Sequence, residues 1–282
     1  MSVGAKVGNI DPLTVDGFGE EWAAYDQTAL SPEEHERRFY DYFDIFPFEK
    51  LPAQAEGFDL GCGSGRWARM MREKVGFLHC IDPSRKALEV AQNSMAGAQN
   101  VRFHLAGADE IPLPDESQDF GYSLGVLHHI PDTEAGMRSC AKKLKPGAPL
   151  LLYLYYNFEN RPFWFRSVWK LSNLARRGIS RLPFRSRKAV TSVVAGLIYL
   201  PLARTSRALE ALGLPVDNIP LSAYRNDAFY TMRTDSLDRF GTRLEHRFSR
   251  AEITAMMKRC GLTDIIFSDN IPHWVALGYK AQ

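Results

Sequence analysis

Two acidic residues and a glycine-rich turn have the spacing expected of a site for a nucleoside-containing ligand. The stretch DLGCGSG puts an acid two residues ahead of alternate glycines: Asp59, Gly61, Gly63 and Gly65. Glycines let a backbone turn sharply and approach a ligand closely. A second acid, Asp82, stands 17 residues after Gly65, where a carboxylate can accept hydrogen bonds from ribose hydroxyls. The alternatives are a plain tight turn and an Asp82 that only caps the helix beginning near Ser84.

The residues in and beside this turn limit the class of ligand that it could bind. Alternate glycines alone are also typical of dinucleotide sites. An acid at position 59, however, would repel a pyrophosphate and would suit a ligand that carries an ammonium group. Cys62 lies inside the turn, and we expect it to contribute its backbone and small size rather than a nucleophilic thiol.

The elements that would position these residues alternate from about residue 55 to 156. Short apolar segments predict strands, and the segments between them predict helices over 66–74, 84–93 and 133–144; the apolar segments are GFDL, GFLHCID, VRFHLA, DFGYSLGVL and APLLLYLYY. Further on, Ser249 and Glu252 predict a capping box that opens another helix, and two strands follow it. Such alternation is typical of a parallel sheet with helices on both faces, whose ligands bind at the carboxyl ends of the strands.

Four linked motifs resemble one family. DLGCGSG, the acid in CIDPS, ADEIPLPDESQDFGYSLGVLHHI and the turn LKPG are similar to class I S-adenosylmethionine-dependent methyltransferases, closest to the small-molecule, type 11 branch. The resemblance implies an α/β fold: a Rossmann-like seven-stranded sheet, mostly parallel with its last strand antiparallel, and a helical insertion after the fifth strand. It implies S-adenosylmethionine as the cofactor.

The resemblance also assigns the cofactor contacts. The glycine turn would hold the methionine part, Asp82 the ribose, and the segment around Ala108 and Asp109 the adenine. Gly107 stands where the family often has an acid, so Asp109 or a backbone group would meet the adenine amino group. The implied contacts are Asp59, Gly61, Cys62, Gly63, Gly65, Asp82, Ala108, Asp109 and Leu124.

Three residues are candidates for catalysis. His128 and His129 follow the fourth predicted strand, where a neutral imidazole could take a proton from the acceptor. Alternatively, either histidine could pack under the turn that follows the pair. A catalytic base is not required, because methyl transfer from a sulfonium needs only alignment and desolvation. Tyr25, in GFGEEWAAYD, could touch the methionine carboxylate or the acceptor, or belong to a helix that simply packs on the sheet. The four cysteines are scattered without a CxxC pair, so no metal site is expected.

Charge divides the chain unevenly. Residues 160–209 hold eleven Lys or Arg and no acid, which leaves 24 basic and 33 acidic residues elsewhere. We therefore expect an N-terminal helical cover over 1–54, a cofactor-binding core over 55–157, a basic aromatic insertion or lid over 158–220, and a C-terminal part over 221–282 that completes the sheet.

The insertion predicts a basic amphipathic helix. Its apolar face would hold Trp164, Phe165, Val168, Trp169, Leu171 and Ala175, and its polar face Arg166, Lys170, Asn173 and Arg177. It could be a lid over an acceptor pocket, an element on an anionic membrane, a nucleic-acid site, or a subdomain that only packs or dimerises. The lid is favoured, with peripheral membrane contact through residues 161–188 as an extension, and nucleic acid comes last.

These patterns together predict an enzyme that methylates O, N or C of a small, apolar or amphipathic acceptor. The alternatives are a non-catalytic cofactor-binding sensor or membrane-docked partner protein, and an RNA methyltransferase. Residues 1–10 lack the pattern of a signal peptide, and the unpaired cysteines suit a reducing compartment. We therefore expect a cytoplasmic protein, peripheral to the inner face of a membrane if the extension holds; a homodimer stays open.

Overall fold

The computed structural model describes residues 8–270 and 274–282, and these divide into two compact units. The first takes in the chain up to Ala23, Glu36–Asn157 and Leu244–Gln282; the second consists of Ala24–His35 and Phe158–Arg243. The domain boundaries expected from the sequence stay predictions.

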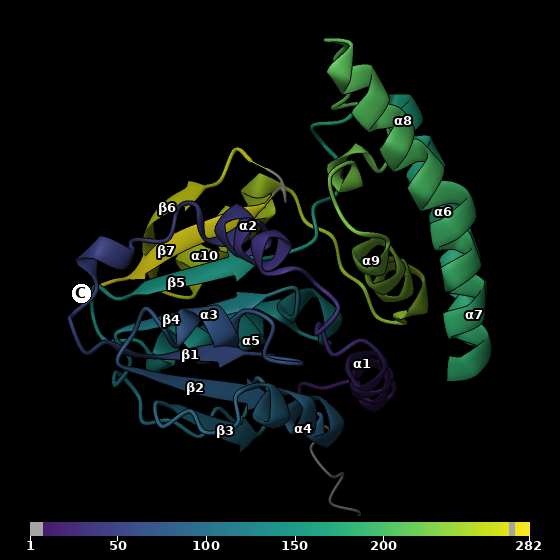
Figure 1. Cartoon of the computed structure of the whole chain (residues 1–282). Coiled ribbons are helices and arrows are strands. Elements are labelled where there is room, and N and C mark those ends of the chain that lie inside the picture. The colour runs from purple at the N-terminus through teal and green to yellow at the C-terminus, as the bar shows by residue number, and fades with distance from the viewer. Residues whose placement is uncertain (1–7, 271–273) are drawn as a thin grey trace, which may run out of the picture. The chain divides into compact units, whose positions relative to one another are not determined.

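A seven-stranded sheet forms the centre of the first unit (Figure 1). Its order is β3-β2-β1-β4-β5-β7-β6, and β7 runs antiparallel to both of its neighbours while the first five strands are parallel. This confirms the predicted fold class. The strands are β1 (Glu56–Leu60), β2 (Phe77–Asp82), β3 (Val101–Leu105), β4 (Phe120–Leu124), β5 (Pro149–Tyr153), β6 (Leu262–Phe267) and β7 (Val275–Lys280).

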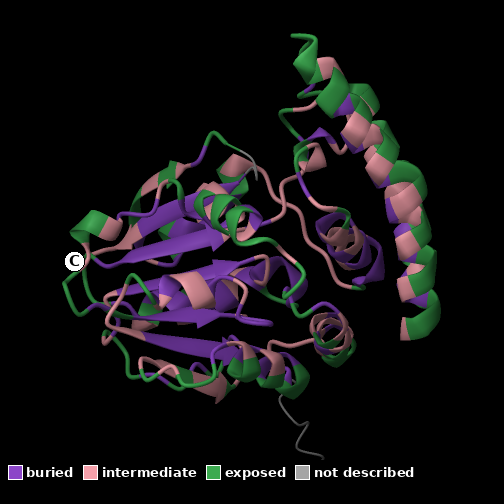
Figure 2. Cartoon of the chain, viewed as in Figure 1, coloured by how far each residue is buried: buried purple, intermediate pink, exposed green. Residues whose placement is uncertain are grey.

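Alternation along β1 separates the two faces of the sheet. Phe58 and Leu60 point into the apolar layer that also holds residues of α5 (Thr133–Lys143) and α10 (Arg250–Arg259). The opposite layer holds residues of α2 (Pro32–Phe43), α3 (Ala68–Met71) and α4 (Arg85–Ser94). The central strands are buried between the layers, as Figure 2 shows. Asp59, between Phe58 and Leu60, therefore faces a buried layer rather than solvent.

The helix caps predicted from the sequence are confirmed, but one helix is shorter than expected. Ser84 caps α4 by accepting from the Ala87 amide, and Ser249 and Glu252 form the predicted capping box of α10. The helix expected over 66–74 is reduced to the four residues of α3. The remaining residues of the expected helix form turns. The glycine turn precedes α3, and after α3 the Gly76 amide donates to the Ala55 carbonyl.

The second unit is helical. It contains α6 (Phe163–Ile179), α7 (Phe184–Val194), a π-helical stretch (Ala195–Tyr199), α8 (Leu200–Ala211) and α9 (Phe229–Gly241). Its small apolar core includes Tyr199, Ala203, Met232 and Phe240. Residues 184–211 run as one 28-residue helix that is, by length and composition alone, apolar enough to cross a membrane. This helix is longer than the apolar run visible in the sequence.

The apolar side of α6 is split rather than continuous. Phe165 and Trp169 both contact Phe158, at ring distances of 5.6 and 5.4 Å, and are half-buried. Leu171 is 70% exposed, and it belongs to a set of exposed residues on α6: Phe163, Trp164, Val168, Leu171 and Leu174. The broad apolar face predicted from the sequence is therefore covered at Phe165 and Trp169 and exposed along the rest of α6. The exposed residues along the helices of the unit are visible in Figure 2.

Candidate functional site

The glycine turn follows β1 directly and is hydrogen-bonded to the neighbouring strand β2. The amides of Gly61 and Cys62 donate to the Ile81 carbonyl of the neighbouring strand, at 2.7 and 3.1 Å. Gly61 has φ +76°, and a Cβ there would collide with the Val126 side chain. Gly63 has φ +55°, and a Cβ there would lie 2.8 Å from Trp22 Nε1 of α1 (Pro12–Ala24). Only glycine suits both positions, because both the backbone angle and the space forbid a side chain.

Asp59 is a buried carboxylate with an unused oxygen. It is 2% exposed, and its Oδ2 has no hydrogen-bond partner among the described residues. Burial raises the pKa of Asp59 to about 8, an effect that the neighbouring Tyr122 hydroxyl opposes and the charge of Asp82 reinforces. An ammonium group placed beside the Asp59 carboxylate would compensate its buried charge. Asp59 therefore fits the amino group of a methionine-type ligand.

Asp82 joins the glycine turn to α4. Its Oδ2 accepts from the Gly63 amide at 2.9 Å, and its Oδ1 accepts from the Ser84 amide at 2.8 Å. Burial raises the pKa of Asp82 to about 6, against the lowering effect of these two amides. The helix cap is Ser84 itself, so Asp82 is not the cap. A carboxylate has about four lone-pair sites, so Asp82 can hold the turn and still accept from ribose hydroxyls.

The residues assigned to adenine lie beside the N-terminal segment. Asp109 Oδ2 accepts from the Asn9 amide at 2.9 Å, and the Asn9 side chain bonds in turn to the backbone of Asp132. Ala108 is buried against the layer that contains α5, and Leu124 is buried at the end of β4. Asn9 was not recognised from the sequence, because its partner is 100 residues away and no local motif marks it.

Cys62 is an inert thiol. It is 5% exposed, and the thiol of Cys80 together with burial raises its pKa well above the usual value. The thiolate population is therefore negligible near neutral pH. This agrees with a role for the backbone of residue 62 rather than for its sulfur.

The two histidines come together just beyond β4. Their ring centroids are 4.1 Å apart in the short helix Leu127–His129, and both side chains are buried. Burial lowers the pKa of His128 well below its usual value, so this imidazole is neutral. His129 Nδ1 lies 2.7 Å from the Leu244 carbonyl. Because a carbonyl can only accept, Nδ1 carries the hydrogen and Nε2 is the nitrogen able to take a proton.

A family model matches the part of the chain that contains the glycine turn, Asp82 and the two histidines. Residues 58–152 match a family model described as a methyltransferase domain. Residues 58–152 form a class I methyltransferase domain. The cofactor of this class of domain is S-adenosylmethionine, as predicted.

Relatives of the methyltransferase domain are matched over part of their length. The chain is 29% identical over 140 residues to Methyltransferase GfsG of Streptomyces halstedii, covering 48% of each protein. It is 38% identical over 98 residues to the 27-O-demethylrifamycin SV methyltransferase of Amycolatopsis mediterranei, covering 33% of this chain and 36% of that protein. The matched region is thus less than half of these relatives' length.

A solved structure supports the fold of the whole chain. One chain of a complex that contains the Haloferax volcanii Trm112 methyltransferase activator aligns with a TM-score of 0.53 and 16% identity. The alignment covers 94% of this chain and 98% of that one. At this identity the likeness concerns the fold alone.

An aromatic group flanks the histidines of the methyltransferase domain and was missed in the sequence. Tyr155 stacks on His128 with ring centroids 3.8 Å apart, and the Arg247 guanidinium lies 4.9 Å from the Tyr155 ring. Phe18 of α1 lies 5.1 Å from the His129 ring. The run YLYY could have indicated Tyr155, since residues 153 and 155 share one side of an extended segment. Arg247 could not be found this way, because it comes from a distant segment.

Tyr25 belongs to the second unit. Its ring meets Tyr230 edge-on at 5.6 Å, and Lys188 Nζ lies 4.8 Å from the ring centroid. A role for Tyr25 beside the cofactor therefore stays a prediction. Within residues 8–270 and 274–282, no group of three His, Cys, Asp or Glu side chains is arranged to hold a metal ion.

Proposed function

We propose that this protein is an S-adenosylmethionine-dependent methyltransferase that acts on O, N or C of a small, apolar or amphipathic acceptor. The observation that supports it most is the buried Asp59 carboxylate beside a turn that excludes side chains, within the methyltransferase domain. A buried carboxylate of this kind costs stability unless a cation meets it. The named rifamycin relative favours a small-molecule acceptor for this chain too.

The bound cofactor would supply a methyl group on a sulfonium, from which a neutral thioether departs as a good leaving group. The protein would contribute orientation and exclusion of water. Asp59 would hold the amino group and Asp82 the ribose, and α1 lies over the glycine turn through Trp22. His129 Nε2 would take the proton that the acceptor loses. The buried, neutral ring of His128 and the half-buried Tyr155 ring stacked on it would line the acceptor side.

Calorimetric titration with S-adenosylhomocysteine tests the first part of this proposal. We expect saturable binding of one molecule per chain, because Asp59 and Asp82 are already in place. The control is adenosine, which lacks the amino acid part and should bind more weakly by at least about tenfold. Absence of any heat of binding from folded protein would contradict the proposal.

We also propose that the second unit contacts an anionic membrane surface from the cytoplasmic side. Apolar side chains are exposed on α6 and on the 28-residue helix, among them Leu171 at 70% and Leu197 at 74%. The same unit contains the eleven basic residues of 160–209. Apolar side chains beside arginines are typical of helices that lie in the headgroup region.

Vesicle flotation tests whether these exposed apolar side chains bind a membrane or are merely exposed to solvent. Wild-type protein should float with vesicles that contain phosphatidylglycerol, and the double variant Leu171→Ser with Leu197→Ser should stay unbound, since it loses two apolar contacts. The matched control is Leu13→Ser with Leu105→Ser, which changes leucines of the first unit that are 57% and 50% exposed. Alkaline carbonate should release the protein. Retention after that wash would indicate a spanning helix and would contradict peripheral contact.

A further inference from the structure

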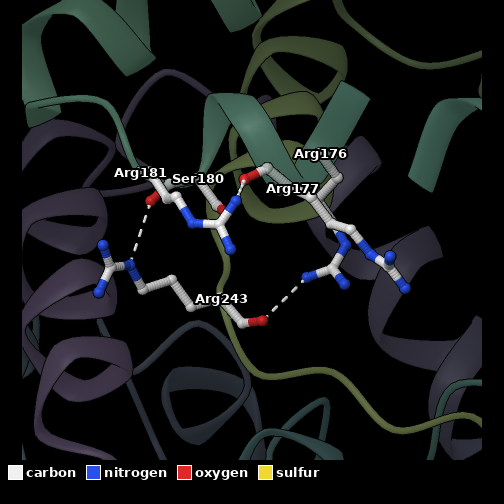
Figure 3. Close-up of a pocket in the computed structure, with 5 residues that line it drawn as sticks. All are labelled: Arg176, Arg177, Ser180, Arg181 and Arg243. Atoms are coloured by element: carbon white, nitrogen blue, oxygen red, sulfur yellow. Dashed lines mark hydrogen bonds between the residues drawn. The ribbon is translucent and has the colours of Figure 1, made fainter. Parts of the chain in front are cut away.

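A pocket lined almost wholly by arginine lies in the second unit (Figure 3). Its volume is about 210 Å³. The lining comes from the end of α6, the turn after it, and the residue that follows Thr242: Arg176, Arg177, Ser180, Arg181 and Arg243. No acidic side chain is among these lining residues.

Arg176 is built into the floor of the pocket. Its side chain is buried, with 8% exposed, and three neutral oxygens are among the groups that hold it. The guanidinium donates to Asn173 Oδ1 at 2.8 Å, to the Thr242 carbonyl at 2.7 Å and to the Arg243 carbonyl at 3.1 Å. A buried guanidinium so fixed presents its charge in one direction, unlike a mobile surface arginine.

The other three arginines stand around it without carboxylate partners. In the described ranges, no Asp or Glu forms an ion pair with Arg177, Arg181 or Arg243. Arg181 Nη1 donates to the Arg177 carbonyl at 2.8 Å, and Arg243 Nε donates to the Ser180 carbonyl at 3.4 Å. Each guanidinium has five N–H donors, so most donors of these three side chains stay available to a ligand.

The negative end of the α6 helix dipole is too weak to explain why four arginines gather at this pocket. The carbonyls at the C-terminus of α6 attract positive charge, but a helix end carries only about half an elementary charge. The guanidinium groups of Arg177, Arg181 and Arg243 around one small cavity repel one another, and that repulsion is relieved when an anion enters. The geometry therefore suits a compact ligand of high negative charge.

We infer that this pocket binds a phosphate group, either free or carried on a small molecule or lipid headgroup. Phosphate offers several oxygens and a charge near −2, which match guanidinium forks arriving from different segments. The buried Ser180 lies in the same lining and adds a hydroxyl. The site lies wholly in the second unit, so it does not depend on methyl transfer.

Calorimetric titration of the whole chain with inorganic phosphate tests the site. The variant is Arg177→Gln/Arg181→Gln/Arg243→Gln, which spares Arg176 because that side chain also holds backbone carbonyls together. We expect its phosphate affinity to fall at least about tenfold, the loss expected when charge-assisted hydrogen bonds are removed. The matched control is Arg166→Gln/Arg185→Gln/Arg207→Gln, which removes the same charge from exposed positions of the same unit and should change affinity less than about twofold.

A second arm identifies the source of the phosphate. Monomeric dihexanoyl phosphatidic acid that binds through the pocket more tightly than inorganic phosphate supports a lipid headgroup, while equal affinity supports a free phosphate group. Equal losses in both triple variants, or no binding of either probe to wild-type protein, would overturn the inference. Unchanged circular dichroism and unchanged S-adenosylhomocysteine binding in each variant show that folding and the cofactor site are intact.

Discussion

Replacing Asp59 by asparagine should stabilise the cofactor-free protein and weaken cofactor binding together. The pKa of Asp59 is about 8 in the folded chain, against 3.8 for an unperturbed aspartate. Between these values the unfolded chain has lost a proton that the folded chain keeps, so stability falls as the pH rises through this window and stays low above it. Asparagine has the same shape and no charge, so Asp59→Asn removes this loss.

We expect Asp59→Asn to raise the free energy of unfolding at pH 7 by at least about 1 kcal/mol, since each pKa unit corresponds to about 1.4 kcal/mol. The gain should shrink as the pH falls toward 5. Affinity for S-adenosylhomocysteine should fall at least about tenfold, because the ammonium group loses its carboxylate. Thermal unfolding between pH 5 and 8, with calorimetric titration at pH 7, measures both effects.

Asp119→Asn is the matched control for this substitution. The Asp119 carboxylate accepts from the Glu56 amide at 2.9 Å and pairs with Lys145 at 2.7 Å. Its loss should therefore lower stability, the opposite sign, and leave cofactor affinity unchanged. A stabilising effect of Asp59→Asn that is the same at pH 5 and pH 7 would show that titration of Asp59 is not its cause.

Gly61→Ala should abolish most cofactor binding. Gly61 has φ +76°, and an added methyl group would meet Val126 at the base of the turn. Either the turn or Val126 must move, and the turn follows Asp59 on β1 and is bonded to Asp82 through the Gly63 amide. We expect affinity for S-adenosylhomocysteine to fall at least about tenfold, or about 1.4 kcal/mol, in calorimetric titration.

Gly97→Ala separates backbone strain from this collision. Gly97 has φ +85°, but nothing lies within 4 Å of the position its Cβ would take. It should cost about 1–2 kcal/mol of stability, as for any left-handed residue that gains a Cβ, and leave cofactor affinity unchanged. Equal loss of cofactor affinity in Gly61→Ala and Gly97→Ala would mean that general destabilisation, not the turn, is responsible.

Much of the cofactor side of the site could be predicted from the sequence, because its determinants are local. A turn that needs positive φ requires glycine, and an acid at the end of a strand is marked by its position. Gly61, Gly63 and Asp82 all lie within one β-α-β unit, from β1 to the end of β2, so a short stretch of sequence is enough to predict their roles. The same locality explains why the Ser84 cap and the box of Ser249 and Glu252 were read correctly.

The surroundings of the two histidines could not be predicted to the same extent. Tyr155 and Arg247 meet beside His128 only because distant segments converge at the carboxyl edge of the sheet. The proton position on His129 depends on the Leu244 carbonyl, 115 residues away. Such pairings follow from packing, and no short sequence pattern records them.

The basic segment shows the same division. Its charge excess and its helical aromatic spacing were determined by the sequence alone, since composition and periodicity need no partner. Tertiary structure decided that Phe165 and Trp169 turn toward Phe158, and that Arg176 is buried among arginines from two other segments. A helix face is defined by periodicity, but which part of that face is covered, and which charges converge, depends on the segments that pack against it.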